Sequence, residues 1–182
     1  MASNPERIYW DSCTYIDYLE GGHALASEME MIMEDWRKGL VLLVTSALTI
    51  AEVLYVKCAD IKRRADRSRE KDIEALFNPP PGPRFLLVEL NRTTALKARD
   101  LVWNAGIDPK DAVHVASALE ARCEVLFTTE GPLRTKTGLV GGTPHLRIES
   151  PSWTKQLTAH EEIEPGRFTK LIGGPTEPQQ PE

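Results

Sequence analysis

The sequence predicts a three-layer α/β/α domain with a central parallel sheet, and three observations indicate it. Short apolar runs, such as LVLLV at residues 40–44, alternate with longer amphipathic segments. A run this uniformly apolar is typical of a strand buried on both faces. Strands that alternate with helices pair in parallel, because each crossover needs a helix. The chain has 182 residues, enough for one domain core. We expect this domain over residues 6–150, followed by a C-terminal extension at 151–182.

Each element follows from the period of its apolar residues and from its stop signals. At residues 24–39 the apolar side chains from Leu25 to Trp36 recur at helical spacing, and Gly39 is a plausible stop. Thr45 or Ser46 can cap the helix after LVLLV. The predicted strands are 7–11, 40–44, 85–90, 124–128 and an edge strand at 145–150; the predicted helices are 14–19, 24–39, 47–58, 61–77, 92–106 and 109–123. Prolines break the chain at 78–83, and the Pro/Gly-rich end at 173–182 predicts disorder.

The composition bears on nucleic-acid binding, on the state of the cysteines and on the cellular compartment. The formal charge of −5 argues against passive, charge-driven binding to nucleic acid, but not against an enzyme that reaches phosphate through a metal ion. The three cysteines, Cys13, Cys58 and Cys123, lie far apart and indicate reduced thiols. The opening residues lack the apolar stretch of an export signal, and the apolar segment 40–56 is too short to span a bilayer. We therefore expect a cytoplasmic protein without a membrane partner.

Four carboxylates occur where strands end or helices begin. Asp11 and Glu130 follow predicted strands, Glu52 lies two turns into the helix after LVLLV, and Asp111 opens the helix 109–123. Because ligands of parallel sheets bind beyond the carboxyl ends of the strands, these acids can converge on one cleft. Four carboxylates in one pocket repel each other unless cations neutralise them. Hard divalent ions such as Mg²⁺ or Mn²⁺ suit such a pocket, and they suit attack on a phosphodiester.

Four stretches that carry these acids resemble the motifs of PIN-domain ribonucleases, most closely the VapC-type toxins of bacterial toxin–antitoxin pairs. They are IYWDSCTYIDYL, TSALTIAEVL, DAVHVASAL and LFTTEGPL, in the family's order over residues 7–133. The third, of the form DAxHxAxAL, is the most specific. The resemblance implies a Mg²⁺- or Mn²⁺-dependent endoribonuclease that hydrolyses RNA without a covalent intermediate. It implies catalytic and metal-binding roles for Asp11, Glu52, Asp111 and Glu130, a cognate antitoxin partner and a homodimer.

One departure from the family pattern keeps a second function open. The fourth acid is usually aspartate, and here it is Glu130, whose extra methylene moves the carboxylate oxygens. The alternative is therefore a catalytically impaired PIN-like scaffold that binds RNA or protein. A third candidate, a phosphohydrolase of the haloacid-dehalogenase kind, requires DxD after the first strand, whereas this chain has DSC.

Several neighbours of the acids have two interpretations each. Ser12 and Thr128 can orient a carboxylate, a water molecule or a phosphate, or they can form only a local turn. His114 lies on the helix face of Asp111 and can be its partner or a general acid, although a satisfied core histidine is the commoner case. Asp111 itself can simply cap its helix.

Two further patterns concern partners. The stretch KRRADRSREK at 62–71 carries six basic and two acidic residues. It predicts either a solvated helix face or an RNA-contacting arm that includes Lys62, Arg63, Arg64 and Arg67. The methionines at 29, 31 and 33, with Leu25 and Trp36, indicate core packing or a groove for a second subunit or an antitoxin.

Overall fold

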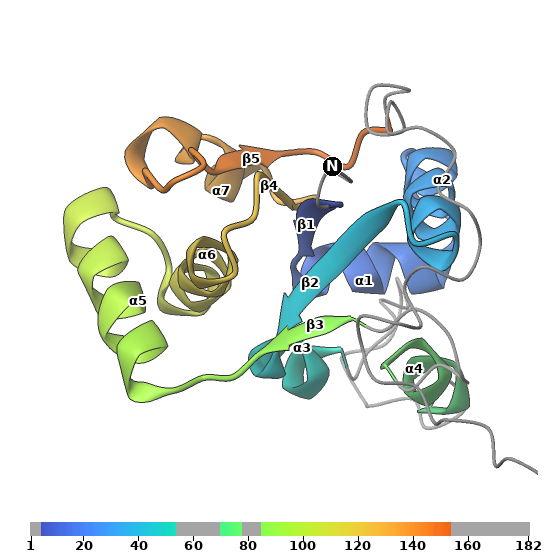
Figure 1. Cartoon of the computed structure of the whole chain (residues 1–182), viewed down its shortest axis with the longest axis horizontal. Coiled ribbons are helices and arrows are strands. Elements are labelled where there is room, and N and C mark those ends of the chain that lie inside the picture. The colour runs from blue at the N-terminus through green and yellow to red at the C-terminus, as the bar shows by residue number, and fades with distance from the viewer. Residues whose placement is uncertain (1–4, 54–69, 78–84, 154–182) are drawn as a thin grey trace, which may run out of the picture.

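The central layer of the molecule is one parallel sheet. The computed structural model describes residues 5–53, 70–77 and 85–153 (Figure 1). Its five strands have the order β3-β2-β1-β4-β5, and every neighbouring pair is parallel. They are β1 (Glu6–Trp10), β2 (Val41–Ser46), β3 (Leu86–Val88), β4 (Val125–Phe127) and β5 (Arg147–Glu149). The chain builds outward from β1 in one direction and then in the other, so the order reverses beside β1, where ligands of such sheets bind.

Helices connect the strands as the sequence predicts. They are α1 (Ser12–Glu20), α2 (Ala26–Arg37), α3 (Ala47–Glu52), α4 (Glu70–Phe77), α5 (Arg92–Ala105), α6 (Pro109–Glu120), the short α7 (Gly131–Arg134) and a 3-10 helix at Thr137–Leu139. The last two were not predicted, because three or four residues are too few to show a helical period. Helix α5 ends at Gly106, whose φ of 59° lies in the left-handed region that glycine adopts readily.

The two faces of the sheet are covered differently, which confirms the three-layer prediction. Helices α5 and α6 cover one face, where Tyr9, Val44 and Leu126 pack with them in one buried cluster. Helices α1, α2 and α4 contribute to the cluster on the other face, where Ile8 and Trp10 point because successive residues of a strand alternate. Figure 1 shows α5 and α6 on one side of the strands, and α1 and α2 on the other.

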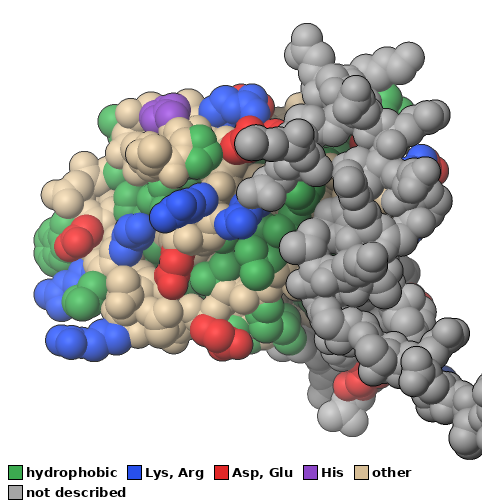
Figure 2. Space-filling model, viewed as in Figure 1, with side chains coloured by type: hydrophobic (Ala, Val, Ile, Leu, Met, Phe, Trp, Pro, Cys, Tyr) green, Lys and Arg blue, Asp and Glu red, His purple; other side chains and the backbone are tan. Residues whose placement is uncertain are grey.

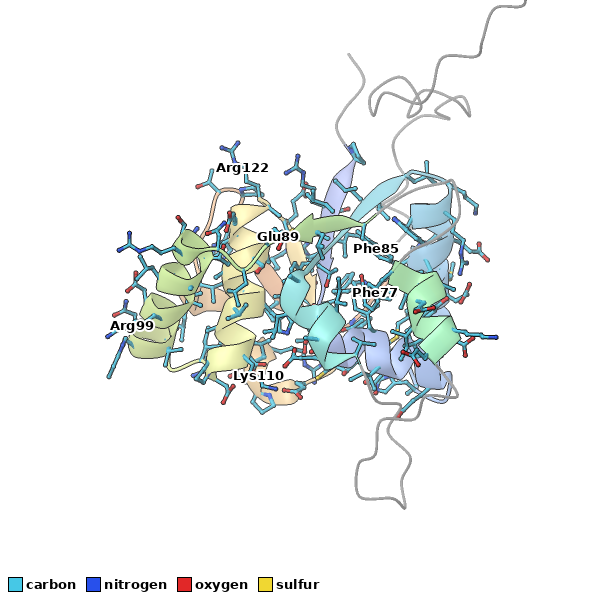
Figure 3. All side chains as sticks on the ribbon, turned by 90° about the horizontal axis from the view of Figure 1, so that it is seen from below. Phe77, Phe85, Glu89, Arg99, Lys110 and Arg122 are labelled. Carbon is cyan, nitrogen blue, oxygen red and sulfur yellow. The ribbon has the colours of Figure 1, made fainter. Side chains whose placement is uncertain are left out.

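The face under α1 and α2 is rich in aromatic residues. Figure 3 shows Phe77 and Phe85 next to each other, and their ring centroids are 6.1 Å apart. Met29, Met33 and Trp36 are buried in this core, so the sequence-based idea of a partner groove formed by them is wrong for these three side chains. They fill the interior because the helix that carries them has its apolar face against the sheet.

Parts of the sequence predictions lie outside the described residues. These are the end of the helix predicted at 47–58, residues 61–69 of the charged helix, the break at 78–83 and nearly all of the C-terminal extension. Within the part that the structure describes, no helix is long and apolar enough to cross a membrane, and residues 40–53 form β2 and α3. Cys13 and Cys123 form no disulfide within the described part of the chain, and Cys58 lies outside it.

Candidate active site at the carboxyl edge of the sheet

Asp11 directly follows β1 and is fixed in place as the N-cap of α1. Its Oδ1 accepts a hydrogen bond from the Thr14 backbone N–H at 2.8 Å. The side chain is buried, and burial raises the pKa of Asp11, whereas nearby His114 and hydrogen bonds from Thr128 and Thr14 act in the opposite direction. Asp11 is therefore a rigid, buried acid and not a solvated residue at a strand end.

Glu52, the last residue of α3, has both carboxylate oxygens engaged. Oε2 accepts from the Ser12 hydroxyl at 2.8 Å and lies 2.9 Å from His114 Nε2. Oε1 lies 3.0 Å from the ammonium group of Lys110. The hydrogen bond from His114 is the main cause that lowers the pKa of Glu52 to about 2, against the effect of burial. The acid in the apolar stretch thus has the donors and the cation that its burial requires.

His114 links Glu52 to the sheet. Its Nδ1 lies 2.9 Å from the Tyr9 hydroxyl, and both side chains are buried. An ionised carboxylate only accepts hydrogen bonds, so Nε2 donates to Glu52 and a neutral ring accepts at Nδ1 from Tyr9. His114 is therefore a satisfied buried histidine, as we favoured, and it is hydrogen-bonded to Glu52 instead of Asp111.

Asp111 lies in the first turn of α6 and does not cap it. The N-cap is Asp108, whose side chain accepts from the Lys110 backbone N–H at 3.1 Å, so the capping interpretation of Asp111 is wrong. Asp111 is half-buried, and burial followed by the negative charge of Glu130 raises its pKa to about 6. Asp108 and Asp11 add to this repulsion, and His114 opposes it. These carboxylates therefore lie close enough to act on each other.

Glu130 ends the loop from β4 into α7, as the N-cap residue of α7. Its backbone N–H donates to the Thr128 hydroxyl at 3.1 Å, and its Oε1 accepts from the Cys13 thiol at 3.0 Å. Thr128 thus serves a local turn and also hydrogen-bonds Asp11. Thr128 therefore both forms a local turn and contacts a carboxylate. The Ser12 hydroxyl donates to the carboxylate of Glu52.

Sequence reasoning missed three polar neighbours of the acids: Tyr9, Cys13 and Lys110. The alternation of β1 would have placed Tyr9 on the same face as Asp11, since residues i and i+2 of a strand share a face. Cys13 lies in the first turn of α1, two residues after Asp11. No local pattern links Lys110 to Glu52, because 58 positions separate them and only the fold joins α3 to α6.

The donor set suits a hard divalent cation, although the acids are not gathered into a finished site. Within the described ranges, no three side chains of His, Cys, Asp or Glu meet closely enough to form a metal-binding group. The negative charges of Glu130 and Asp11 nevertheless act on Asp111, and in this part of the chain none of the three acids forms an ion pair with Lys or Arg. Carboxylates without a counter-ion fit Mg²⁺ or Mn²⁺ by their chemistry.

The predicted basic arm cannot be placed beside these acids. Lys62, Arg63, Arg64 and Arg67 all lie outside the described residues. On the face shown in Figure 2, the described Lys and Arg side chains lie among acidic and hydrophobic ones and form no continuous basic patch.

The fold and these acids define a class: an α/β protein with a parallel sheet and carboxylates grouped where the strand order reverses. The sequence model of the PIN domain matches residues 8–134, and the chain belongs to the PIN domain family. The match covers all four motif acids and confirms the resemblance found in the sequence. No curated protein matches the sequence at a significant level.

Two solved structures share the fold. The structure of VapC20 from Mycobacterium tuberculosis, described as a toxin that cleaves the sarcin–ricin loop, has a TM-score of 0.53 and 11% identity, and the match covers 70% of this chain and 93% of that one. The structure of FitAB bound to a DNA fragment has a TM-score of 0.52 and 12% identity, with 79% of this chain and 94% of that one covered. At these identities the similarity shows a shared fold.

Proposed function

We propose that this protein is a metal-dependent endoribonuclease and the toxin component of a type II toxin–antitoxin pair. The observation that carries the proposal is the state of Asp111: burial, and after it the negative charges of Glu130, Asp108 and Asp11, raise its pKa to about 6, and no Lys or Arg ion pair offsets this in the described part of the chain. A PIN domain that leaves carboxylates in this state is suited to recruit a cation. The description of VapC20 as a toxin that cleaves the sarcin–ricin loop supports RNA as the substrate class.

The residues of the candidate site have two proposed roles: some would bind a cation, and others orient those acids. Asp11, Asp111 and Glu130 would hold Mg²⁺ or Mn²⁺, with Glu52 as the fourth acid at the same edge. When bound, such an ion lowers the pKa of a water molecule and offsets negative charge on the phosphate. Thr14 and Thr128 fix the orientation of Asp11, and Ser12 and His114 fix Glu52. Preorganised side chains lose little freedom when substrate binds.

The direct test is cleavage of RNA by the purified full-length chain with Mn²⁺ or Mg²⁺ and again with EDTA. We expect cleavage only with metal, and loss of cleavage in Asp111→Asn while the fold persists by circular dichroism. Asp100→Asn is the matched control, because Asp100 lies exposed on α5. Cleavage that survives EDTA, or that Asp111→Asn retains, would contradict the proposal.

A catalytically impaired scaffold that binds RNA or protein is the second candidate. Two observations favour it: Glu130 stands where the family usually has aspartate, and the oxygens of Glu52 are already engaged by Lys110, His114 and Ser12. Calorimetric titration with Mn²⁺ separates the candidates, because an impaired site binds the ion poorly whether or not it binds RNA.

The partners are also part of the proposal. We propose a cognate antitoxin and a homodimer, and a cytoplasmic setting. Light scattering of the purified chain gives the oligomeric state. A small DNA-binding protein that is encoded beside this chain, co-purifies with it and inhibits its cleavage would support the antitoxin.

A further inference from the structure

Lys110 is the basic side chain that contacts an acid of the candidate site. It is the second residue of α6, and its Nζ lies 3.0 Å from Glu52 Oε1. Figure 3 shows Lys110 at the end of α6 near α3, whereas Arg122 lies beyond the opposite end of that helix. The Lys110 side chain is 70% exposed and that of Glu52 is 15% exposed, so the ammonium group reaches the buried acid from the solvent side.

The contacts of Glu52 leave little room for a metal ion beside Lys110. Oε2 is held by Ser12 and by His114, which is itself buried and bonded to Tyr9. A cation that approached Oε2 would have to break this buried network. A cation that approached Oε1 would have to displace the ammonium group of Lys110, which already provides a positive charge there.

The opposite half of the site differs from the Glu52 half. In the described part of the chain, Asp11, Asp111 and Glu130 form no ion pair with Lys or Arg, whereas Glu52 lies 3.0 Å from the ammonium group of Lys110. Among the described residues, the Glu52 half of the site therefore already has a paired cation, and the other half has none. Nucleases with two metal ions place the second ion about 3.5–4 Å from the first, where it stabilises the charge of the phosphate group.

We propose that Lys110 occupies the place of a second metal ion: its ammonium group, held by Glu52, contacts a phosphate oxygen of the RNA, while Asp11, Asp111 and Glu130 bind a single divalent ion. This inference rests on the proposed nuclease function. A lysine ammonium is a compact point charge with three N–H donors, so it can serve a carboxylate and a phosphate oxygen together. Because its side chain is 70% exposed, the ammonium group is accessible to a large substrate that approaches from solvent.

The first experiment measures Mn²⁺ binding without RNA, by calorimetry on the full-length chain. We expect one Mn²⁺ per chain in the wild type. Lys110→Met frees Glu52 Oε1, so this variant should bind a second Mn²⁺ or bind the first about 2- to 5-fold more tightly. Lys38→Met is the matched control, because Lys38 is also an exposed lysine paired with a glutamate, Glu34, but lies at the end of α2 away from the site.

The second experiment measures RNA cleavage at a Mn²⁺ concentration that, by the calorimetric titration, fills the first site but not a second one. Lys110→Met should slow cleavage by about 10-fold or more, since a charge that stabilises the phosphate is lost. Lys110→Arg should restore part of the rate and keep wild-type Mn²⁺ binding, and Lys38→Met should change neither quantity. Unchanged Mn²⁺ binding in Lys110→Met overturns the proposal, and so does unchanged cleavage.

The role of Lys110 and the proposed nuclease function can be disproved separately. If the wild type cleaves RNA with metal and Lys110→Met behaves identically, only the role of Lys110 is overturned. If the wild type neither binds Mn²⁺ nor cleaves RNA, the proposed function fails and this inference fails with it.

Discussion

The candidate site has carboxylates on two sides, the Glu52 side and the Asp111 side, and their surroundings have opposite effects on the pKa of the acid. On the Glu52 side, one carboxylate meets a lysine, a histidine and a serine hydroxyl. On the Asp111 side, the carboxylates of Glu130, Asp108 and Asp11 raise the pKa of Asp111, and Glu130 accepts a hydrogen bond from a thiol. The first arrangement stabilises the folded protein, and the second destabilises it until a cation binds. Stability and cation recruitment are thus assigned to neighbouring halves of one site.

The largest effect on this contrast should come from Asp111→Asn. The change removes an acid that the proposal needs for cleavage, yet in the metal-free protein it removes the cost of burying a charge and the repulsion from Glu130. A pKa raised from 3.8 to about 6 costs up to ~3 kcal/mol at neutral pH. Because Asp111 is only half-buried, solvent screening reduces the expected gain to about 1–2 kcal/mol. Urea unfolding at pH 7 with EDTA should show a more stable variant, and equal or lower stability would contradict the assignment.

Glu52→Gln should have the opposite sign. The glutamine keeps an acceptor for Ser12 and His114 but loses the charge that Lys110 and His114 stabilise. We expect the free energy of unfolding to fall by about 1–2 kcal/mol at pH 7, since the Glu52 pKa is lowered to about 2 and the group is partly solvated. Measured beside Asp111→Asn under identical conditions, the two variants should shift the urea midpoint in opposite directions.

The pH dependence of the metal-free protein sharpens the same contrast. The raised pKa of Asp111 gives a contribution that is present at low pH and is lost as the pH rises through about 6. The lowered pKa of Glu52 gives a contribution that is present above about 4.5 and is lost as the pH falls toward about 2. As the pH is lowered from 7 to 5, the free energy of unfolding of the wild type should therefore rise relative to that of Asp111→Asn. A constant difference between the two over this range would contradict the raised pKa.

The fold could be predicted from the sequence because local patterns determine it. The continuous apolar run of β2 and the helical spacing in α2 each indicate an element on its own, and glycines mark where helices stop. The parallel order follows because every crossover contains a helix. Helix α7 could not be predicted, since Gly131–Arg134 is too short to have a period.

The site was predictable only in part. The motif spacing indicated four acids at one edge, and the structure brings Asp11, Asp111 and Glu130 within electrostatic reach of each other. The pairing of Glu52 with Lys110 could not be predicted, because it depends on how α6 packs against α3 and not on any local pattern. The role of Asp108 as the cap of α6 was missed because Asp111 fits the same helix-start signal.

Tyr9→Phe should have a smaller effect than either acid substitution. It removes the hydroxyl that donates to His114 Nδ1 and leaves that buried nitrogen without this partner. An unsatisfied buried acceptor costs about 1–3 kcal/mol, and the lower end applies where the ring can relax. In urea unfolding, the free energy of unfolding should fall by about 1 kcal/mol. Cleavage should fall only slightly, because the Glu52 side chain is held less firmly by His114. Loss of cleavage as complete as in Asp111→Asn would mean that Tyr9 takes part in catalysis directly and does not only position His114.

Cys13→Ser should have the smallest effect, and it tests whether the Asp111 side depends on charge alone. The thiol donates to Glu130 Oε1 at 3.0 Å, and Cys13 is only partly buried. A serine hydroxyl keeps a donor at this position, and neither group carries charge, so the repulsion between Glu130 and Asp111 remains. We expect cleavage within about 2-fold of the wild type and unchanged Mn²⁺ affinity, because a neutral donor of similar size adds about as much as the one it replaces. A large loss of Mn²⁺ affinity in Cys13→Ser, with the fold intact by circular dichroism, would mean that the thiol itself is a ligand, and that the two halves of the site differ in more than their charges.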